Sequence, residues 1–327
     1  MRILITGATG FVGSHAADRF LKGGHSVRAL VRGSSNLKWL TGKEIETVKG
    51  NLQDVESLNH ALNGVDAVVH IAGVTASKTR EGFYRDNQLA TRNLLEATKK
   101  FGSHVGRFVL ISSQTVGGPS LDGNPVTEET PPHPLTTYAK SKLAAEEEAR
   151  QFRGDFPVTI LRVAAVYGPR DTAILSFFQT VSKRIKPLIG FQEKYVNLAH
   201  AYDVAQGIEL GVIRPEAENR TFYLGSERQY GWRELSNLAS EIMGRRGVFI
   251  PIPHIVVHGI AGLSEFASLF KKQPSVLNWE KRLDLTQLNW ICSIERAKKE
   301  LGYTPKIGIK EGFEETIDWY QKVKWIK

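Results

Sequence analysis

Residues 2–22 read Arg-Ile-Leu-Ile-Thr-Gly-Ala-Thr-Gly-Phe-Val-Gly-Ser-His-Ala-Ala-Asp-Arg-Phe-Leu-Lys. The apolar run that ends at Thr6 predicts a short buried strand, and apolar residues at helical spacing resume after Gly13. Glycines stand between them at positions 7, 10 and 13. Glycine permits a tight turn, lets a pyrophosphate approach backbone N–H groups, and lets a helix pack close to a strand. The stretch therefore predicts a dinucleotide-binding strand, turn and helix, with a purely structural glycine-rich turn as the alternative.

The residues that follow alternate between strand-like and helix-like segments. Strands are predicted at residues 26–31, 67–72 and 107–111, a further unit at 47–54, and helices at 55–62 and 89–100. Such alternation predicts an α/β fold with a doubly wound parallel sheet. Ligands bind these sheets at the carboxyl ends of the strands, which is where Gly7, Arg32, Gly73 and Ser113 fall.

The end of the second predicted strand bears on the choice of cofactor. In dinucleotide folds an acid at this place binds the 2′-hydroxyl of NAD, whereas an arginine accommodates the 2′-phosphate of NADP. This strand ends Leu30-Val31-Arg32-Gly33-Ser34-Ser35-Asn36, without an acid. Arg32, with Ser34 or Ser35 as further donors, suits a phosphate. We therefore predict NADP, with NAD bound without an acidic contact as the alternative.

Composition narrows the class of protein. The chain has 327 residues and a net charge of +9, but its basic residues are scattered and no nucleic-acid-binding signature is present, so we expect no nucleic-acid partner. The single cysteine, Cys292, excludes an internal disulfide and fits a reducing cytosol. We find no signal-peptide pattern and no run of about 20 apolar residues. A cytoplasmic protein without an integral membrane segment is expected, and no metal ligands are assigned.

The segment Thr137-Tyr-Ala-Lys-Ser-Lys142 is a candidate for the chemistry. Tyr138 and Lys142 are four residues apart, so on a helix they share one face. A fixed ammonium one turn away is expected to lower the pKa of the phenol, which suits it to proton transfer with an alcohol or ketone oxygen. The alternative is a tyrosine packed over a lysine stem.

Further motifs occur in order along the chain. They are Thr6-Gly-Ala-Thr-Gly-Phe-Val-Gly13, Asp54, His70-Ile-Ala-Gly73, Asn87, Ile111-Ser-Ser-Gln-Thr-Val116, Tyr138-Ala-Lys-Ser-Lys142, Leu161-Arg162, Val166-Tyr-Gly-Pro169, Asp203-Val-Ala205 and Glu300-Leu-Gly-Tyr-Thr-Pro305. With these motifs the chain resembles the extended short-chain dehydrogenase/reductase family, also described as the NAD-dependent epimerase/dehydratase family. The resemblance covers nearly the whole chain, and the apolar stretch Pro251–Phe270 places it nearest the 3β-hydroxysteroid dehydrogenase and dihydroflavonol reductase branch.

The resemblance implies roles for individual residues. Ser113 would hydrogen-bond the reacting oxygen, Tyr138 would be the acid/base, and Lys142 would tune the phenol and bind the nicotinamide ribose. Asn87 matches a family asparagine near the active site, although helix capping explains it nearly as well. The cofactor-binding residues implied are Gly7, Thr9, Gly10, Phe11, Val12, Arg32, Asn36, Leu52, Asp54, Ala72, Gly73, Asn87, Ser112, Tyr138 and Lys142.

Some positions depart from the family pattern or invite a structural interpretation. Gly117 stands where sugar epimerases and dehydratases commonly keep a tyrosine beside the substrate. The lack of that tyrosine is expected to leave room for a larger or flatter ligand. We interpret His70 as a packed histidine, Asp203 as a structural hydrogen-bonding residue and Cys292 as a small buried residue.

The alternation loosens after Pro169. Helices are predicted at 173–186, 203–213, 232–243 and, as an amphipathic segment, 251–270, and a strand at 221–224 is expected to return to the main sheet. We expect a dinucleotide-binding Rossmann domain at 1–170, completed by about 201–225, and a smaller C-terminal substrate lobe at 171–200 and 226–327. A lobe rich in Ile, Val and Phe would desolvate an apolar ring system, although its own core explains these residues at least as well.

The combined hypothesis is an NADP(H)-preferring oxidoreductase that transfers hydride between the nicotinamide and a secondary alcohol or its ketone, a small-molecule substrate. One alternative is a nucleotide-sugar epimerase or dehydratase with tightly bound NAD, and another is a non-catalytic cofactor-sensing protein. Dimers are usual in the family, so the resemblance is compatible with a homodimer. Attachment of the apolar segment 251–270 to a membrane surface is a further alternative.

Overall fold

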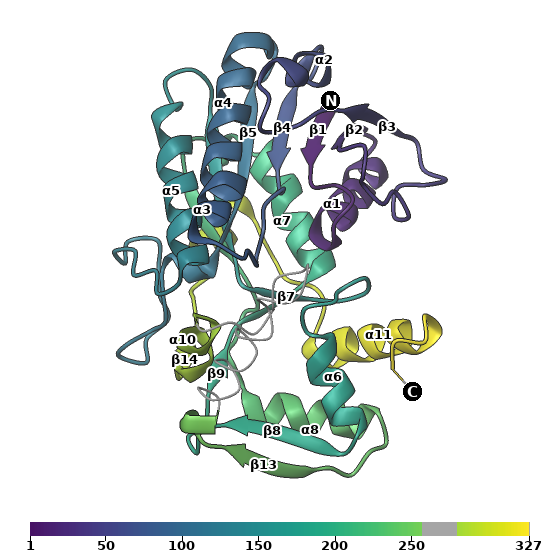
Figure 1. The fold of residues 1–327 in the computed structure, drawn as a ribbon, viewed down its shortest axis with the longest axis vertical. Helices are drawn as coiled ribbons and strands as arrows, with labels where there is room; N and C mark the ends of the chain where they lie inside the picture. The colour runs from purple at the N-terminus through teal and green to yellow at the C-terminus, as the bar shows by residue number, and fades with distance from the viewer. Residues whose placement is uncertain (257–279, 327) are drawn as a thin grey trace.

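The computed structural model describes residues 1–256 and 280–326, and its centre is a seven-stranded parallel sheet (Figure 1). The strand order is β11-β6-β5-β4-β1-β2-β3. The bounds are β1 Arg2–Thr6, β2 Ser26–Val31, β3 Ile45–Lys49, β4 Ala67–His70, β5 Arg107–Ser113, β6 Val158–Val163 and β11 Thr221–Leu224. The order reverses on either side of β1, which creates a crevice at the carboxyl ends of β1 and β4. The predicted doubly wound α/β fold is confirmed.

Helices cover both faces of this sheet. On one face lie α1 (Phe11–Lys22) and α7 (Ala201–Ile213), and on the other lie α2 (Asn59–Leu62), α4 (Ala90–Phe101) and α5 (Thr137–Gln151). The residues of β1 alternate between the two cores: Ile3 and Ile5 pack on the side of α1 and α7, while Leu4 packs on the side of α4 and α5. A strand buried on both faces is therefore apolar throughout, as the run before Gly7 predicts.

The remaining elements connect the sheet or build a second layer beyond its carboxyl edge. The remaining helices and helical turns are η1 Glu56–Leu58, α3 Arg80–Phe83, η2 Tyr84–Leu89, η3 Gln114–Val116, α6 Leu175–Ser182, η4 Pro215–Ala217, α8 Trp232–Ile242, α10 Lys281–Thr286, η5 Ala297–Leu301 and α11 Ile309–Lys322. The short strands are β7 Ala165–Tyr167, β8 Ile185–Ile189, β9 Tyr195–Val196, β10 Leu198–His200, β12 Tyr230–Gly231, β13 Val248–Ile252 and β14 Asn289–Trp290. A separate aromatic core, which includes Phe178, Phe313 and Tyr320, joins α6, α8 and α11.

Two predicted helices of the C-terminal half are wrong in part. The helix expected at 173–186 ends at Ser182, and Lys186 lies instead in β8, which pairs in parallel with β13. In the segment expected at 251–270, Pro251 and Ile252 belong to β13, residues 254–256 are helical as predicted, and the residues from 257 onward lie outside the described part of the chain. Both differences arise because β8 and β13 pair across a long stretch of sequence, which local periodicity does not reveal.

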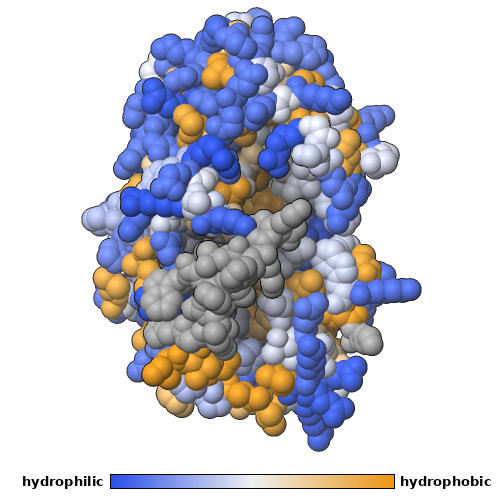
Figure 2. Space-filling view, viewed as in Figure 1, coloured by the Kyte–Doolittle hydropathy of each residue, from blue (hydrophilic) through white to orange (hydrophobic). Residues whose placement is uncertain are grey.

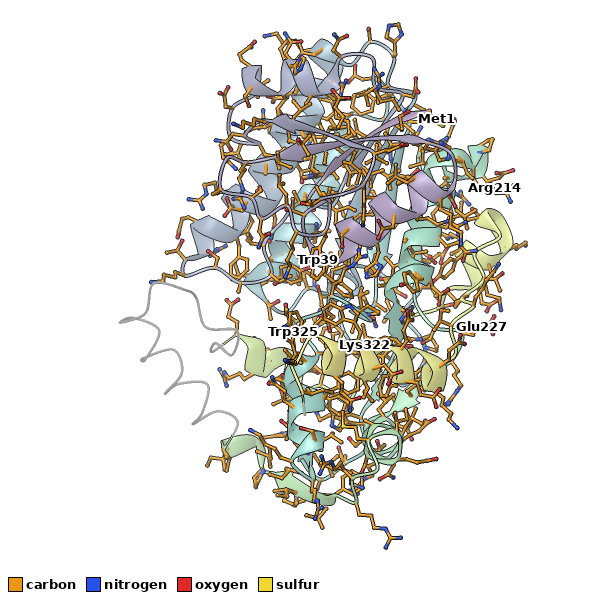
Figure 3. All side chains as sticks on the ribbon, turned by 90° about the vertical axis from the view of Figure 1, so that its right-hand side faces the viewer. Met1, Trp39, Arg214, Glu227, Lys322 and Trp325 are labelled. Carbon is orange, nitrogen blue, oxygen red and sulfur yellow. The ribbon has the colours of Figure 1, made fainter. Side chains whose placement is uncertain are left out.

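The end of the chain returns to the cofactor half. Figure 3 shows Trp325 and Lys322 on the side of the molecule where Trp39 lies, in the loop between β2 and β3. The rings of Trp39 and Trp319 are 5.9 Å apart, and the Lys38 ammonium is 4.2 Å from the Trp39 ring. Helix α11 therefore packs on the loop that follows Arg32. Within residues 1–256 and 280–326, every helix is too short or too polar to cross a bilayer.

The contact between the first turn and α1 generates a stability prediction. A Cβ atom at Gly13 would lie 2.1 Å from the Gly7 carbonyl oxygen, which is backbone and cannot swing aside. We expect Gly13→Ala to lower the free energy of unfolding by about 1–3 kcal/mol, measured by urea denaturation, because helix and turn must separate. Gly154→Ala is the matched control, since nothing lies within 4 Å of its Cβ position. Equal unfolding midpoints for the two variants would contradict this account.

Candidate active site

A cavity of about 220 Å³ opens at the carboxyl ends of β1, β4, β5 and β6. Its lining is Val12, Ile71, Gly73, Val74, Thr75, Asn87, Ile111, Ser112, Ser113, Tyr138, Lys142, Val163, Ala164 and Val166. The three residues predicted to carry the chemistry, Ser113, Tyr138 and Lys142, therefore face one space. They reach it from two elements, because Ser113 ends β5 while Tyr138 and Lys142 lie on α5.

The glycine-rich turn beside this cavity is shaped to hold an anionic group. Gly7 has φ +77°, and its own Cβ would lie 2.7 Å from the Ala72 nitrogen, so only glycine fits. The Gly10 N–H donates to the Gly7 carbonyl oxygen at 3.0 Å, and α1 begins immediately after it. No side chain caps Gly10 and no acid stands in the first turn of α1. The positive end of this helix is thus open to a pyrophosphate, and the residues present fit a dinucleotide.

The Ser113 hydroxyl is oriented by Thr115. Both the backbone N–H of Thr115, at 3.2 Å, and its hydroxyl, at 2.9 Å, hydrogen-bond the Ser113 Oγ atom. With its lone pairs used in this way, Ser113 has its own proton left to donate toward Tyr138 or a ligand oxygen. Sequence reasoning missed Thr115. Its position two residues after a strand-end serine, where it forms a local side-chain turn, was the signal available.

The expected lowering of the Tyr138 pKa is wrong for this structure. Burial raises the pKa of Tyr138, the charge of Asp284 adds to the rise, and the hydrogen bond with Ser113 opposes it. The Lys142 ammonium, whose Nζ atom donates to the Ile111 carbonyl oxygen at 2.6 Å, does not offset the effect of burial on the Tyr138 pKa. Tyr138 is therefore a neutral phenol near neutral pH and carries a proton that it can give away.

Lys142 is almost fully buried, at 6% exposure. Burial lowers the pKa of Lys142 to about 8, and the nearby carboxylate of Glu146 holds it from falling further. A lysine with this pKa gains or loses its proton near physiological pH, so a group that binds beside it can change its protonation state.

Glu146 fastens α5 to the sheet. Its carboxylate is fully buried and accepts hydrogen bonds from the Ser112 hydroxyl at 2.6 Å and from Arg162 at 2.9 and 3.0 Å. Arg150 adds a contact at 2.6 Å. These partners hold the pKa of Glu146 below its usual value despite burial. Because Glu146 lies one turn beyond Lys142, the same bonds fix Lys142 relative to β5.

The space expected beside Gly117 is not open to a ligand. A Cβ atom at Gly117 would lie 2.1 Å from the Tyr223 hydroxyl oxygen and 2.9 Å from a methyl carbon of Val126. Tyr223 is fully buried, and its hydroxyl accepts a hydrogen bond from Arg162 at 3.2 Å. Tyr223, which comes from β11, thus occupies the place that a side chain at position 117 would need. The sequence-based expectation of extra room for a ligand is corrected.

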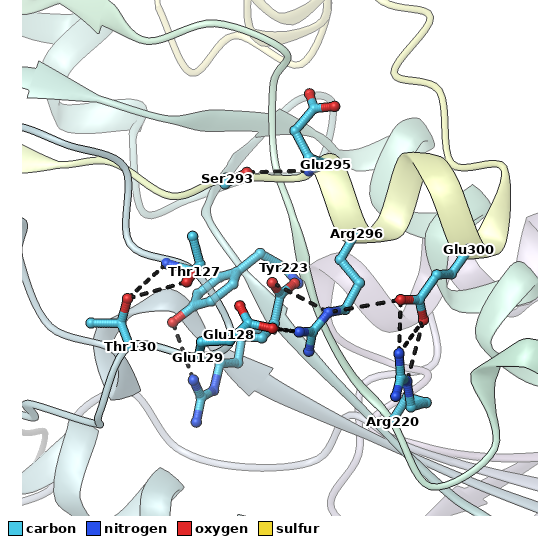
Figure 4. A network of polar contacts seen from close by, with 11 residues as sticks. Thr127, Glu128, Glu129, Thr130, Arg220, Tyr223, Ser293, Glu295, Arg296 and Glu300 are labelled. Carbon is cyan, nitrogen blue, oxygen red and sulfur yellow. Dashed lines mark hydrogen bonds and ion pairs between the residues drawn. The ribbon is translucent and has the colours of Figure 1, made fainter.

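A polar network behind Tyr223 ties the C-terminal segment to the sheet (Figure 4). The Tyr223 N–H donates to Glu128 at 2.8 Å, and Arg296 lies 3.8 Å from Glu128 and 4.0 Å from Glu300. Arg220 pairs with Glu300 at 2.8 Å. Burial raises the pKa of Glu128, while Arg296 acts against this. Through Glu128, the network anchors the loop between β5 and α5 to β11 and to the C-terminal segment.

Asn87 braces the cavity wall and does not cap a helix. Its side-chain oxygen accepts from the Val74 N–H at 2.8 Å, and its amide donates to the Val74 carbonyl at 3.1 Å and to the Ser141 hydroxyl at 2.9 Å. A Cβ at Gly73 would lie 2.7 Å from the Asn87 oxygen, so a larger residue there would displace the Asn87 amide. Asn87 therefore joins the segment after β4 to α5, and the capping interpretation is wrong.

The predicted adenosine-side residues lie along the same sheet edge but outside the cavity. Arg32 follows β2 and is exposed, and its N–H donates to the Ser35 hydroxyl at 3.0 Å. Asn36 accepts from the Lys38 N–H at 3.0 Å, and Asp54 is exposed after β3. Leu52 offers its carbonyl to Asn93 at 2.7 Å. Of the other predicted cofactor contacts, Val12, Gly73, Asn87 and Ser112 line the cavity, whereas Gly7, Thr9, Gly10, Phe11 and Ala72 do not.

His70, Asp203 and Cys292 have the structural roles that the sequence predicts. His70 is buried between the hydroxyls of Thr6, at 2.6 Å, and Thr91, at 3.0 Å, and burial lowers its pKa to about 3. Asp203 accepts from the N–H groups of Lys306 and Ile307 at 2.9 and 3.2 Å. Cys292 is buried and burial raises its pKa, so it is a poor nucleophile.

The chain is similar to a known protein family and to characterised relatives. The model of the NAD-dependent epimerase/dehydratase family matches residues 3–231. The chain is 30% identical to a ceramide reductase of Caulobacter vibrioides, over 99% of this chain and 96% of the relative. It is 26% identical to a decarboxylating sterol-4-alpha-carboxylate 3-dehydrogenase of Dictyostelium discoideum, over 96% and 99% of the two chains.

Solved structures show the same fold. A UDP-glucose 4-epimerase from Thermotoga maritima, crystallised with UDP-glucose, superimposes with a TM-score of 0.81 at 22% identity over 99% of this chain and 100% of that chain. The chain therefore belongs to the NAD-dependent epimerase/dehydratase family and is an NAD(P)-dependent enzyme of the extended short-chain dehydrogenase/reductase type.

Proposed function

We propose that the protein is an NADP(H)-preferring oxidoreductase that interconverts a secondary alcohol and its ketone. The observation that carries this proposal is the meeting of Ser113, Tyr138 and Lys142 around one cavity beside the glycine-rich turn. The nicotinamide cofactor supplies or accepts the hydride when bound. The protein positions the reactants and moves the proton.

In the direction of reduction, Tyr138 donates the proton. Its raised pKa keeps the phenol protonated, so it can donate to the oxygen that gains negative charge. Ser113, held by Thr115, donates a second hydrogen bond to the same oxygen and stabilises the developing charge. In the direction of oxidation the proton moves the other way, from the alcohol to the Tyr138 phenolate, while Ser113 still donates to the same oxygen.

Lys142 orients the cofactor ribose and sets the local charge. Its ammonium is held at the end of β5 by the Ile111 carbonyl, within the same cavity as Tyr138. A ribose hydroxyl can accept from a second N–H of this ammonium, because a lysine has three donors. Glu146 keeps the lysine charged by raising its pKa against the effect of burial.

The preference for NADP rests on the exposed Arg32 and on the lack of an acid in the segment Val31–Asn36. An exposed guanidinium at the end of β2 suits a 2′-phosphate, which an aspartate or glutamate would repel. NAD remains the alternative cofactor. Gly7, Thr9, Gly10, Phe11 and Val12 would hold the pyrophosphate in either case.

The substrate class that we propose is apolar. Val12, Ile71, Val74, Val163 and Val166 form a hydrophobic wall of the cavity beside Ser113, Tyr138 and Lys142. The lining also includes Thr75, Asn87 and Ser112, and the side chains of Asn87 and Ser112 are already hydrogen-bonded within the protein. The two relatives named above are a ceramide reductase and a sterol dehydrogenase, names that specify lipid substrates. Residues 171–200 and 226–327 would form the substrate lobe over residues 1–170 and 201–225.

The rival function is a nucleotide-sugar epimerase or dehydratase with tightly bound NAD, which the family and the UDP-glucose 4-epimerase fold also fit. The two activities differ in whether free cofactor is consumed. An oxidoreductase oxidises one NADPH for each ketone reduced, whereas an epimerase leaves the total unchanged. We propose a cytoplasmic location on the basis of the single cysteine, and homodimerisation stays a prediction that sedimentation would check.

Removing the phenol should abolish turnover without preventing binding. We expect Tyr138→Phe to lower kcat for reduction of an apolar ketone by roughly 10²–10⁴-fold, with little change in NADPH affinity, because only the proton donor is lost. The measurement is NADPH oxidation coupled to product analysis. Tyr84→Phe is the control, since Tyr84 lies on η2 outside the cavity. Near-normal turnover in Tyr138→Phe would overturn the mechanism, and cofactor binding without turnover of any ketone would favour a sensing protein.

The pKa of the buried Lys142 predicts how kcat/KM falls at high pH. Lys142 has a pKa of about 8, so its charge is lost as pH rises through this value, while Tyr138, whose pKa is raised, keeps its proton. We expect kcat/KM for reduction to fall about tenfold per pH unit above this point. Glu146→Gln should move this fall to lower pH, because the carboxylate raises the Lys142 pKa. A profile that stays flat through about pH 9 would exclude this role for the lysine charge.

Cofactor preference provides a separate check on Arg32. We expect Arg32→Ala to weaken NADPH binding roughly 10–100-fold and NADH binding less than about twofold, because the side chain would contact only the 2′-phosphate. Titration calorimetry of both nucleotides measures this. Lys22→Ala, which removes the same charge at the far end of α1, should leave both affinities unchanged. Equal losses for NADPH and NADH would contradict the assignment.

A further inference from the structure

The parallel pair β8 and β13 has one face that is apolar in every position. The register pairs Val248 with Ile185, Ile250 with Pro187 and Ile252 with Ile189. Side chains that pair in this way share one face of a sheet. We call these six residues the outer face: Ile185, Pro187, Ile189, Val248, Ile250 and Ile252. None of them is buried, and Val248 is 67% exposed and Ile250 42%.

The opposite face of the pair packs on the protein. The Lys186 ammonium donates to Asn237 of α8 at 2.9 Å, and it lies 4.7 Å from the Phe249 ring. Arg233 approaches the same ring at 5.1 Å, and Leu188 is 2% exposed. Because α8 already covers this inner face, the outer face points away from the molecule. Figure 1 places both strands at the end opposite the main sheet, and Figure 2 shows hydrophobic residues gathered there.

The two ends of the outer face differ in character. The strands are parallel, so their carboxyl ends lie together, and the residues that follow them include Phe191, 71% exposed, and Ile255, 78% exposed. At the amino ends stand two basic pairs, Lys183-Arg184 and Arg245-Arg246. Within residues 1–256 and 280–326 none of these four cations forms an ion pair.

We propose that the outer face docks on an anionic lipid bilayer surface. An exposed apolar face inserts among acyl chains while the cations beside it meet anionic headgroups, which is the arrangement of proteins that lie on a membrane without crossing it. This goes beyond the proposed reaction, because docking needs neither cofactor nor turnover. It would place an enzyme for apolar substrates at the phase where such substrates reside.

A second copy of the chain fits this face less well. Two-fold pairing with the strands of the two copies running in the same direction would bring the four cations of one copy toward those of the other, which costs free energy. Six side chains also cover far less than the roughly 800 Å² per partner of a stable interface. Extension of the sheet by an added strand is hindered because both strands contain a proline, Pro187 and Pro251, which lacks an N–H.

Sedimentation with lipid vesicles tests the proposal. We expect the wild-type protein to sediment with vesicles of equal parts phosphatidylcholine and phosphatidylglycerol, to stay in solution with phosphatidylcholine alone, and to be released by high salt. The double variants Val248→Ser/Ile250→Ser and Arg184→Ser/Arg246→Ser should each lower the partition coefficient roughly tenfold or more. Leu121→Ser, which alters a side chain 80% exposed elsewhere, and Lys22→Ser should bind as the wild type does.

Each variant is first checked for an unchanged thermal midpoint, and a pair that fails this check is replaced by the single variants Val248→Ser and Arg246→Ser. The proposal is overturned if the wild-type protein does not bind anionic vesicles, or if the apolar variant binds as well as the wild type. It is also overturned if the apolar variant converts a dimer to a monomer without changing vesicle binding, because the occupant would then be a second copy.

Discussion

The buried carboxylate of Glu146 is the interaction on which the geometry of the site depends. It bonds Ser112 at the end of β5 and Arg162 on β6, and it lies on the same helix as Tyr138 and Lys142. Removing it would leave the Arg162 guanidinium, which is 3% exposed, without its charge partner. A buried ion pair of this kind contributes less to net stability than to the placement of the groups around it. Here it sets how α5 sits against the sheet edge.

The charges in the site follow from that placement. The Lys142 ammonium donates to the Ile111 carbonyl oxygen, and burial lowers its pKa to about 8 although the Glu146 carboxylate opposes this, whereas burial raises the pKa of Tyr138. The protein without cofactor therefore presents a neutral phenol and a lysine that is easily discharged. A bound nicotinamide ribose would change both environments, which couples cofactor binding to the protonation state of the site.

The protein has two separate apolar surfaces. Valine and isoleucine side chains line the catalytic cavity, and a second apolar surface lies on β8 and β13 at the far end of the molecule. The network of Glu128, Arg296 and Glu300 ties the C-terminal segment to the loop between β5 and α5. The cavity lies at the edge of the main sheet and the other surface lies on the pair β8 and β13, and each has charged groups beside it.

The sequence by itself determined the features that depend on residues near one another in the chain. The glycine spacing after Thr6, the alternation of strands and helices, and the four-residue interval between Tyr138 and Lys142 are local, and local sterics and periodicity govern them. Only the tertiary structure decided that Tyr223 fills the space over Gly117, that Asn87 braces Val74, and that β8 pairs with β13. It also decided the direction of the Tyr138 pKa, because burial and partners come from segments distant in sequence, and no local pattern records which of them will meet.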